Sequence, residues 1–207
     1  MCYRGTAQQR GKTQIVGNPV KLITPKRYGD SRGWFSETYV ATRWAQQGVD
    51  VMFVQDNHSF SGPVGTIRGI HFQKIPHPQA KLVRCIRGAI IDYAVDLRRG
   101  SPTYGQFAAA ELTAENGHQL YLPVGFGHAF VTTAPDTEVL YKVSDFYAPD
   151  CEGGVRWDCP DIGIDWPLPA SGPVLSDKDL TLPLLAQFES VFTYAGHPLE
   201  PIAAPQG

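Results

Sequence analysis

The sequence predicts an all-β protein, built as a sandwich or barrel of antiparallel strands. Short apolar runs recur along the chain, and turns rich in Gly and Pro, which number 21 and 17, separate them. Residues 89–98 alternate apolar and more polar side chains, which is the period of two expected for a strand. Helical patterns are confined to two short patches. This regular spacing of strands favours closed antiparallel sheets over alternating strand–helix units.

The N-terminal part of the chain is expected to hold short strands around one small helix. Residues 20–23 form a first apolar run, and residues 34–39 alternate aromatic and polar side chains after a turn-rich loop at 28–33. A helix is expected at 42–47, where a glycine follows. The apolar residues 51–54 predict the next strand.

The remaining predicted strands follow from residue 65 onward. The stretch from Gly65 to Gly88 carries apolar runs typical of adjacent strands. The later strands are apolar runs bounded by turns, at residues 89–98, 107–112, 119–122, 129–132 and 139–146. From Pro149 onward the chain is rich in Pro, Asp and Gly, with one helix expected at 183–189.

Length and composition indicate one domain in 207 residues. We expect a mobile N-terminal extension at 1–17, the domain at 18–190, and a C-terminal tail at 191–207 that is loose from His197 onward. The net charge of −2, without long runs of one sign, indicates neither a nucleic-acid nor a membrane partner. Four cysteines without Cys-x-x-Cys spacing, and no apolar run of membrane-spanning length, favour a cytoplasmic protein.

Two stretches share the spacing of the paired cupin motifs. In the first, five residues separate Gly65 from His71, and the motif closes at Gly88. The second runs from Gly117 through a Pro-x-Gly step to His128. The chain therefore resembles the cupins, and this resemblance implies a jelly-roll β-barrel or sandwich with a few short peripheral helices.

The match to the cupins breaks down at their metal ligands. Metal cupins have a second His and a Glu in the first motif, where this chain has Gln73 and Lys81. An ammonium group repels a divalent cation. We therefore expect no metal and no other cofactor, which disfavours a metal-dependent cupin oxygenase.

Three side chains predict a chemistry for the barrel interior. Tyr141 shares a strand face with apolar neighbours, and inward residues of a small barrel can surround one ligand. If His71 and Lys81 face the same cavity, the trio suits proton abstraction next to a carbonyl: the histidine removes the α-proton, the ammonium stabilises the enolate oxygen, and the phenol returns a proton. Taken singly, His71 also fits a structural role and Tyr141 a core aromatic.

Nine longer segments match one family. They are residues 29–37, 53–59, 68–73, 81–84, 95–103, 123–130, 140–142, 163–167 and 175–179. On these segments the chain resembles the RmlC family, the dTDP-4-dehydrorhamnose 3,5-epimerases of dTDP-L-rhamnose synthesis. The resemblance extends over roughly residues 18–190 and implies a cofactor-free isomerase of a nucleotide sugar.

The resemblance also implies a substrate and residue roles. The substrate is dTDP-4-dehydro-6-deoxy-D-glucose, a dTDP-4-keto-6-deoxyhexose, which is inverted at carbons 3 and 5 through an enolate to dTDP-4-dehydro-L-rhamnose. His71 matches the general base, Asp179 its partner, Lys81 the enolate-stabilising cation, and Tyr141 the acid. Seven further positions match residues that bind the substrate or lie beside it: Arg32, Phe35, Glu37, Gln55, Asn57, Arg68 and His128. Part of this set acts across a homodimer interface with exchanged N-terminal strands, and pairing would also cover the strand edge near Val20.

Two other functions stay open at this level. The chain can be a monoepimerase that inverts only carbon 3 or carbon 5, as in antibiotic deoxysugar pathways; the placement of the sugar ring and of Tyr141 decides between them. It can also be a non-catalytic sugar- or nucleotide-binding cupin. The presence of His71, Lys81, Tyr141 and Asp179 argues against the second alternative, because binding alone needs no convergent acid and base.

Overall fold

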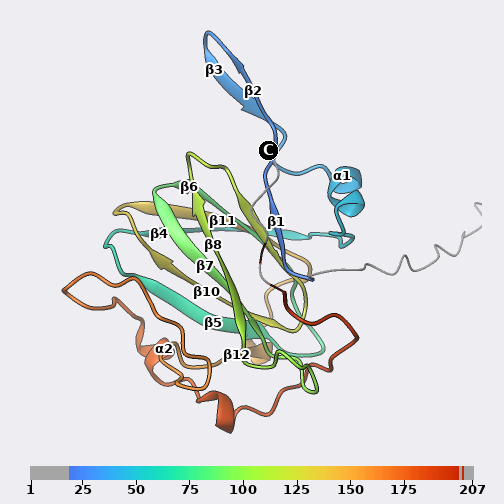
Figure 1. The fold of residues 1–207 in the computed structure, drawn as a ribbon, viewed down its shortest axis with the longest axis vertical. Coiled ribbons are helices and arrows are strands. Elements are labelled where there is room, and N and C mark those ends of the chain that lie inside the picture. The colour runs from blue at the N-terminus through green and yellow to red at the C-terminus, as the bar shows by residue number, and fades with distance from the viewer. Residues whose placement is uncertain (1–18, 201, 203–207) are drawn as a thin grey trace, which may run out of the picture.

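Two five-stranded antiparallel sheets face each other in this computed structural model, and a two-stranded hairpin stands apart from them (Figure 1). The structure describes residues 19–200 and 202, so the extension predicted at 1–17 lies outside the described residues. The first sheet has, in spatial order, β1 (Lys21–Ile23), β9 (Gln119–Leu122), β6 (Lys81–Arg87), β11 (Thr137–Val143) and β4 (Gln55–Ser61). The second has β12 (Glu152–Gly154), β5 (Ile67–Gln73), β10 (Phe126–Thr132), β7 (Ala89–Asp96) and β8 (Phe107–Thr113). The predicted all-β jelly-roll class is confirmed.

The space between the two sheets is apolar in one half and polar in the other. Val83, Ile90, Leu120 and Phe126 belong to the buried cluster that fills the apolar half. Inward-facing positions recur along each strand, because side chains alternate between its two faces. On the strands that carry this apolar cluster, other inward-facing positions hold polar side chains. The polar half is therefore formed mainly by strands of the barrel.

Strand β7 is buried on both faces. Tyr93 and Val95 pack on the outside of the second sheet, in a cluster with Trp166 and Phe192 from the C-terminal part of the chain. On the inner face, Asp92 is fully buried. The polar residues in the alternating pattern of this strand consequently do not mark a solvent-exposed face.

The helices are few and short: α1 (Ala41–Gln46), the 3-10 turn η1 (Pro149–Cys151), α2 (Asp177–Leu180) and the 3-10 turn η2 (Leu185–Gln187). Helix α1 lies within one residue of its predicted position, and its Trp44 packs with Leu82 and Tyr121 against the outside of the first sheet. The helix expected at 183–189 shortens to η2, and α2, which was not predicted, precedes it. Among the described residues, none of the helices combines the length and apolarity needed to span a membrane.

Two predictions for the N-terminal part differ from the structure. The loop expected at 28–33 belongs to a hairpin of β2 (Arg27–Asp30) and β3 (Gly33–Ser36), which projects beyond the barrel in Figure 1. Residues 51–54 form no strand. Their side chains Val51 and Phe53 pack against the α1 cluster instead, and pairing with β11 begins only at Gln55.

The described part of the tail predicted at 191–207 packs on the barrel, and this includes His197 and Leu199, which lie in the stretch expected to be loose. Phe192 is 5% exposed, and the Arg98 guanidinium donates to the His197 carbonyl over 2.9 Å. The Leu199 amide donates to Thr103 Oγ1 over 3.0 Å. Backbone groups and apolar side chains of this segment thus find partners at the end of β7, which holds the segment in place.

Candidate active site

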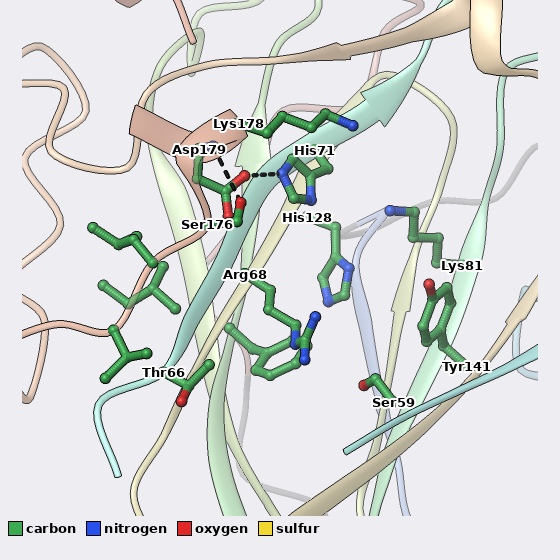
Figure 2. A pocket seen from close by; sticks show the side chains of 14 residues that line it. Ser59, Thr66, Arg68, His71, Lys81, His128, Tyr141, Ser176, Lys178 and Asp179 are labelled. Carbon is green, nitrogen blue, oxygen red and sulfur yellow. Dashed lines mark hydrogen bonds and ion pairs between the residues drawn. The ribbon is translucent and has the colours of Figure 1, made fainter. Parts of the chain in front are cut away.

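A pocket of about 380 Å³ opens in the polar half of the barrel. Its walls come from β4, β5, β6, β10 and β11 and from the segment that leads into α2 (Figure 2). A hollow of about 280 Å³ adjoins it and shares His71, Lys81, Tyr141 and Lys178 with the pocket. The two spaces together form one trough, with these four side chains between its halves.

His71 and Asp179 form the first of two histidine–carboxylate pairs. His71 Nε2 lies 2.5 Å from Asp179 Oδ1, although 108 positions separate the two residues. Because an ionised carboxylate only accepts hydrogen bonds, Nε2 carries the proton and Nδ1 is left to accept one. The side chain of His71 is 34% exposed, and that of Asp179 is 4% exposed. The ring is thus open to a ligand, while its partner is shielded from water.

Helix α2 sets the position and charge of Asp179. Ser176 caps this helix by accepting a hydrogen bond from the Asp179 amide over 3.3 Å. Burial alone would raise the pKa of the Asp179 carboxyl, but the hydrogen bond and charge of His71, with help from Ser176 and Lys178, lower it below its ordinary value. The carboxylate therefore stays ionised at neutral pH.

His128 and Asp92 form the second pair, on β10 and β7. His128 Nε2 lies 2.7 Å from Asp92 Oδ1, and the side chains are 7% and 0% exposed. Burial lowers the pKa of His128, and Asp92 opposes this; burial raises the pKa of Asp92, and His128 opposes that. His128 is also the β10 residue paired with His71 of β5. The second pair therefore lies beside the first but farther from solvent.

Lys81 and Tyr141 lie across the pocket from His71 and Asp179 (Figure 2). The Lys81 ammonium is 5.9 Å from the centroid of the Tyr141 ring. Burial lowers the pKa of Lys81 to about 8, against the opposing charge of Asp92. Burial also raises the pKa of Tyr141, although the Arg68 charge opposes that rise. At neutral pH the pocket thus holds a cation and a protonated phenol facing an imidazole.

The other predicted binding residues fall into two groups. Arg68 and His128 line the pocket, and Gln55 and Asn57 line the adjoining hollow, where Gln55 Nε2 donates to Asn57 Oδ1 over 2.8 Å. The remaining three do not reach the trough of their own chain: Arg32, Phe35 and Glu37.

The hairpin carries Arg32 and Phe35, and Glu37 directly follows it. Arg32 forms an ion pair with Asp30 at 2.6 Å, and its side chain is 88% exposed. Phe35 is 65% exposed, and Glu37 pairs with Arg43 over 2.9 Å. A role in this trough would require a second copy of the chain.

Several residues in or directly behind the trough were not predicted as site residues. Asp92, which lies behind the pocket as the buried partner of His128, is one, since an aspartate in an alternating strand looks like a surface residue. Lys178, which forms an ion pair with Glu152, lies between the pocket and the hollow. Its place inside the matching segment 175–179 is the signal that would have identified it. Ser59 lines the pocket and likewise lies inside a matching segment, 53–59, whereas Tyr147, which lines the hollow, lies in none of them.

The position that holds a metal ligand in metal cupins has a structural role here. The Gln73 side chain is buried, and its amide donates to the His77 and Phe146 carbonyls over 2.7 and 3.1 Å. Within residues 19–200 and 202, no three His, Cys, Asp or Glu side chains are arranged to hold a metal ion.

Comparisons with known proteins identify the family. The family model described as dTDP-4-dehydrorhamnose 3,5-epimerase matches residues 12–187. An enzyme of that name from Sinorhizobium fredii is 50% identical over 176 residues, which cover 84% of this chain and 89% of the relative.

Solved structures agree in fold. The epimerase RmlC from Legionella pneumophila, in complex with dTDP-4-keto-L-rhamnose, has a TM-score of 0.82 at 39% identity, covering 89% of this chain and 97% of that one. ChmJ, a 3'-monoepimerase from Streptomyces bikiniensis in complex with dTDP-quinovose, has a TM-score of 0.76 at 37% identity, covering 83% and 86%. With a family model across most of its length and a half-identical relative, this chain belongs to the dTDP-4-dehydrorhamnose 3,5-epimerase family.

Proposed function

We propose that this protein is an isomerase that inverts carbons 3 and 5 of dTDP-4-dehydro-6-deoxy-D-glucose and forms dTDP-4-dehydro-L-rhamnose without a cofactor. The observation that carries the proposal is the pocket in which the His71–Asp179 pair faces Lys81 and Tyr141. Family membership supports the same reaction. Both carbons flank the ketone at carbon 4, so one set of groups serves both inversions.

The proposed reaction moves protons through named atoms. His71 Nδ1 takes the proton from carbon 3 or carbon 5, and Asp179 stabilises the imidazolium that forms. The electron pair of the broken C–H bond moves to the ketone oxygen, where the Lys81 ammonium balances the enolate charge. The enolate then collapses and takes the Tyr141 hydroxyl proton on the opposite face. Solvent restores the phenol, and His71 returns its proton to water.

Proton NMR in deuterium oxide tests this proposal. Incubating dTDP-4-dehydro-6-deoxyglucose with the protein should erase the signals at carbon 3 and carbon 5, because each abstracted proton is replaced from solvent. Exchange at one carbon alone would instead support a monoepimerase. Absence of exchange at both carbons would remove the epimerase proposal for this substrate.

The monoepimerase remains the second candidate because one relative of the same fold, ChmJ, carries that description. A 3'-monoepimerase inverts a single carbon, so the fold alone does not select between the two reactions. The NMR experiment separates them without any assumption about substrate orientation.

We also propose a homodimer that exchanges its N-terminal segments, so that the β2–β3 hairpin reaches the trough of the partner. The hairpin exposes Tyr28, Trp34 and Phe35, which are 49%, 59% and 65% exposed, and clustered apolar side chains of this kind mark interaction surfaces. Among the described strands, β4 leaves one edge of the first sheet unpaired. A second copy would cover these features and bring Arg32, whose fork suits a diphosphate, to the substrate.

Mixing two inactive variants tests the exchange. Arg32→Ala removes the proposed diphosphate contact, and His71→Asn removes the base. A mixed dimer then contains one intact site, so a refolded equal mixture should regain about a quarter of wild-type activity if Arg32 acts in the partner. No recovery in a mixture shown to contain mixed dimers would contradict exchange.

A cytoplasmic location completes the proposal, since Cys85, Cys151 and Cys159 are free thiols, as expected in a reducing compartment.

A further inference from the structure

One polar group in the pocket has no partner within the described part of the chain. Ser59 Oγ is buried and makes no hydrogen bond. The residue lines the pocket together with Arg68, His128 and Tyr141. A hydroxyl shielded from water without a partner destabilises the free protein, so such a group calls for an explanation.

The position of Ser59 directs its hydroxyl to the sugar end of the trough. Strand β4 alternates its faces, so the inward set comprises Gln55, Asn57, Ser59 and Ser61. Ser59 pairs with Val139 on β11, and the next inward residue, Asn57, pairs with Tyr141. Figure 2 shows the Ser59 hydroxyl on the side that faces the Arg68 guanidinium.

Two hydrogen bonds fix the Arg68 guanidinium and leave its Nη1 nitrogen available to a ligand. Its Nε donates to Ser61 Oγ over 3.2 Å, and its Nη2 donates to the Phe60 carbonyl over 3.0 Å. Neither bond uses Nη1. A hydroxyl accepts from such a donor and also exchanges a hydrogen bond with a serine, which supplies both a donor and an acceptor.

We infer that Ser59 is a specificity-determining residue that binds a ring hydroxyl of the hexose, between its own hydroxyl and Arg68. This inference rests on the proposed function, because it assigns the pocket to the sugar. The contact fixes the ring relative to the neighbouring Tyr141. It selects hexoses that keep their ring hydroxyls over the corresponding deoxy sugars.

Ser61 provides a matched control on the same face of the same strand. Its hydroxyl is already used by Arg68, whereas that of Ser59 is not. Ser59→Ala should therefore leave the melting temperature of the free protein unchanged or higher, because it removes an unpaired buried hydroxyl. Ser61→Ala should lower it, because it removes a hydrogen bond.

Substrate analogues provide the decisive test. Rates of deuterium incorporation at carbon 5 are measured on dTDP-4-dehydro-6-deoxyglucose and on its 2-deoxy and 3-deoxy analogues, all of which keep that carbon. Ser59→Ala should lower kcat/KM about tenfold on the full substrate, and less than about twofold on one of the analogues, which already lacks the hydroxyl. Equal losses on all three substrates, or no loss on the full one, would overturn the inference.

The wild-type reaction keeps this inference distinct from the proposed function. Exchange at carbon 5 of the full substrate by the wild-type protein must be present before any variant is compared. Its absence would reject the epimerase, and the role of Ser59 with it. Its presence together with an unselective Ser59→Ala variant would reject the role of Ser59 alone.

Discussion

The two histidine–carboxylate pairs share their chemistry and differ in their surroundings. His71 is about one-third exposed beside its buried partner, and His128 is almost fully buried with Asp92. The first pair joins β5 to a short helix more than a hundred positions away, and the second joins neighbouring strands β10 and β7. The same two residue types therefore form one pair that is open to the pocket and one that is buried behind its wall, of which only His128 lines the pocket.

This difference assigns different tasks to the pairs. An imidazole open to the pocket can take a proton from a ligand, and an ionised carboxylate behind it stabilises the charge that results. A buried pair pays a high desolvation cost for any change in charge. His128 is therefore suited to hold its neutral ring in one orientation, and Asp92 to act on the charge of Lys81.

The largest expected effect comes from the exposed pair. His71→Asn should lower kcat by about 10²- to 10⁴-fold, because it removes the general base. His128→Asn should cost much less, since no proton passes through that ring. Steady-state rates of both variants check this. Equal losses would remove the distinction between the two pairs.

The partner carboxylate should show the next largest effect. Asp179→Asn keeps the size of the side chain but no longer selects the tautomer that leaves Nδ1 free, so we expect kcat to fall about 10²-fold. Substrate affinity should change little. Full activity in this variant, with thermal unfolding unchanged, would show that His71 needs no partner.

The pH dependence of kcat tests how Asp92 of the buried pair acts on Lys81. Lys81 stabilises the enolate only while protonated, and its pKa is lowered to about 8, so kcat should fall as the pH rises through this value. Asp92 raises the pKa of Lys81, so Asp92→Asn should move this fall to lower pH. Lys81→Arg, in which the charge persists, should move it to higher pH. An alkaline limb that stays in place in both variants would contradict the assignment.

The smallest effect concerns stability. His128→Asn leaves the fully buried Asp92 without its hydrogen bond to the imidazole, so unfolding should become easier by about 1–3 kcal/mol. His71→Asn should change the free energy of unfolding by less, because its ring contacts solvent. Denaturant titration of the two variants compares them directly. A larger loss of unfolding free energy for His71→Asn would contradict the conclusion that the buried pair contributes more to stability than the exposed one.

Sequence reasoning predicted the barrel better than the parts attached to it. The Gly, Pro and alternation patterns identified most strands, since these signals arise from local backbone geometry. The 28–33 region was read as a loop because Gly29 and Gly33 are turn residues, yet they occupy a hairpin. The C-terminal segment from His197 onward looked loose because its partners, Arg98 and Thr103, lie far away in the sequence.

The residues of the candidate active site could likewise be predicted only in part from local sequence patterns. Alternation placed Tyr141 on an apolar strand face, and its convergence with His71 and Lys81 was expected on the condition that these two face the same cavity. Asp179 was assigned only through the family resemblance, because contact between residues 108 positions apart leaves no local signal. Asp92 was missed because burial of both faces of β7 depends on a C-terminal cover that the strand pattern does not reveal.

The central claim is that one base, His71, serves both carbons that flank the ketone. Deuterium exchange by the wild-type protein and by His71→Asn, followed at carbon 3 and carbon 5 in the same sample, tests it most directly. The account predicts that the substitution slows exchange at both carbons by similar factors. Exchange that persists at the wild-type rate at either carbon would show that another group removes that proton, and would contradict the account.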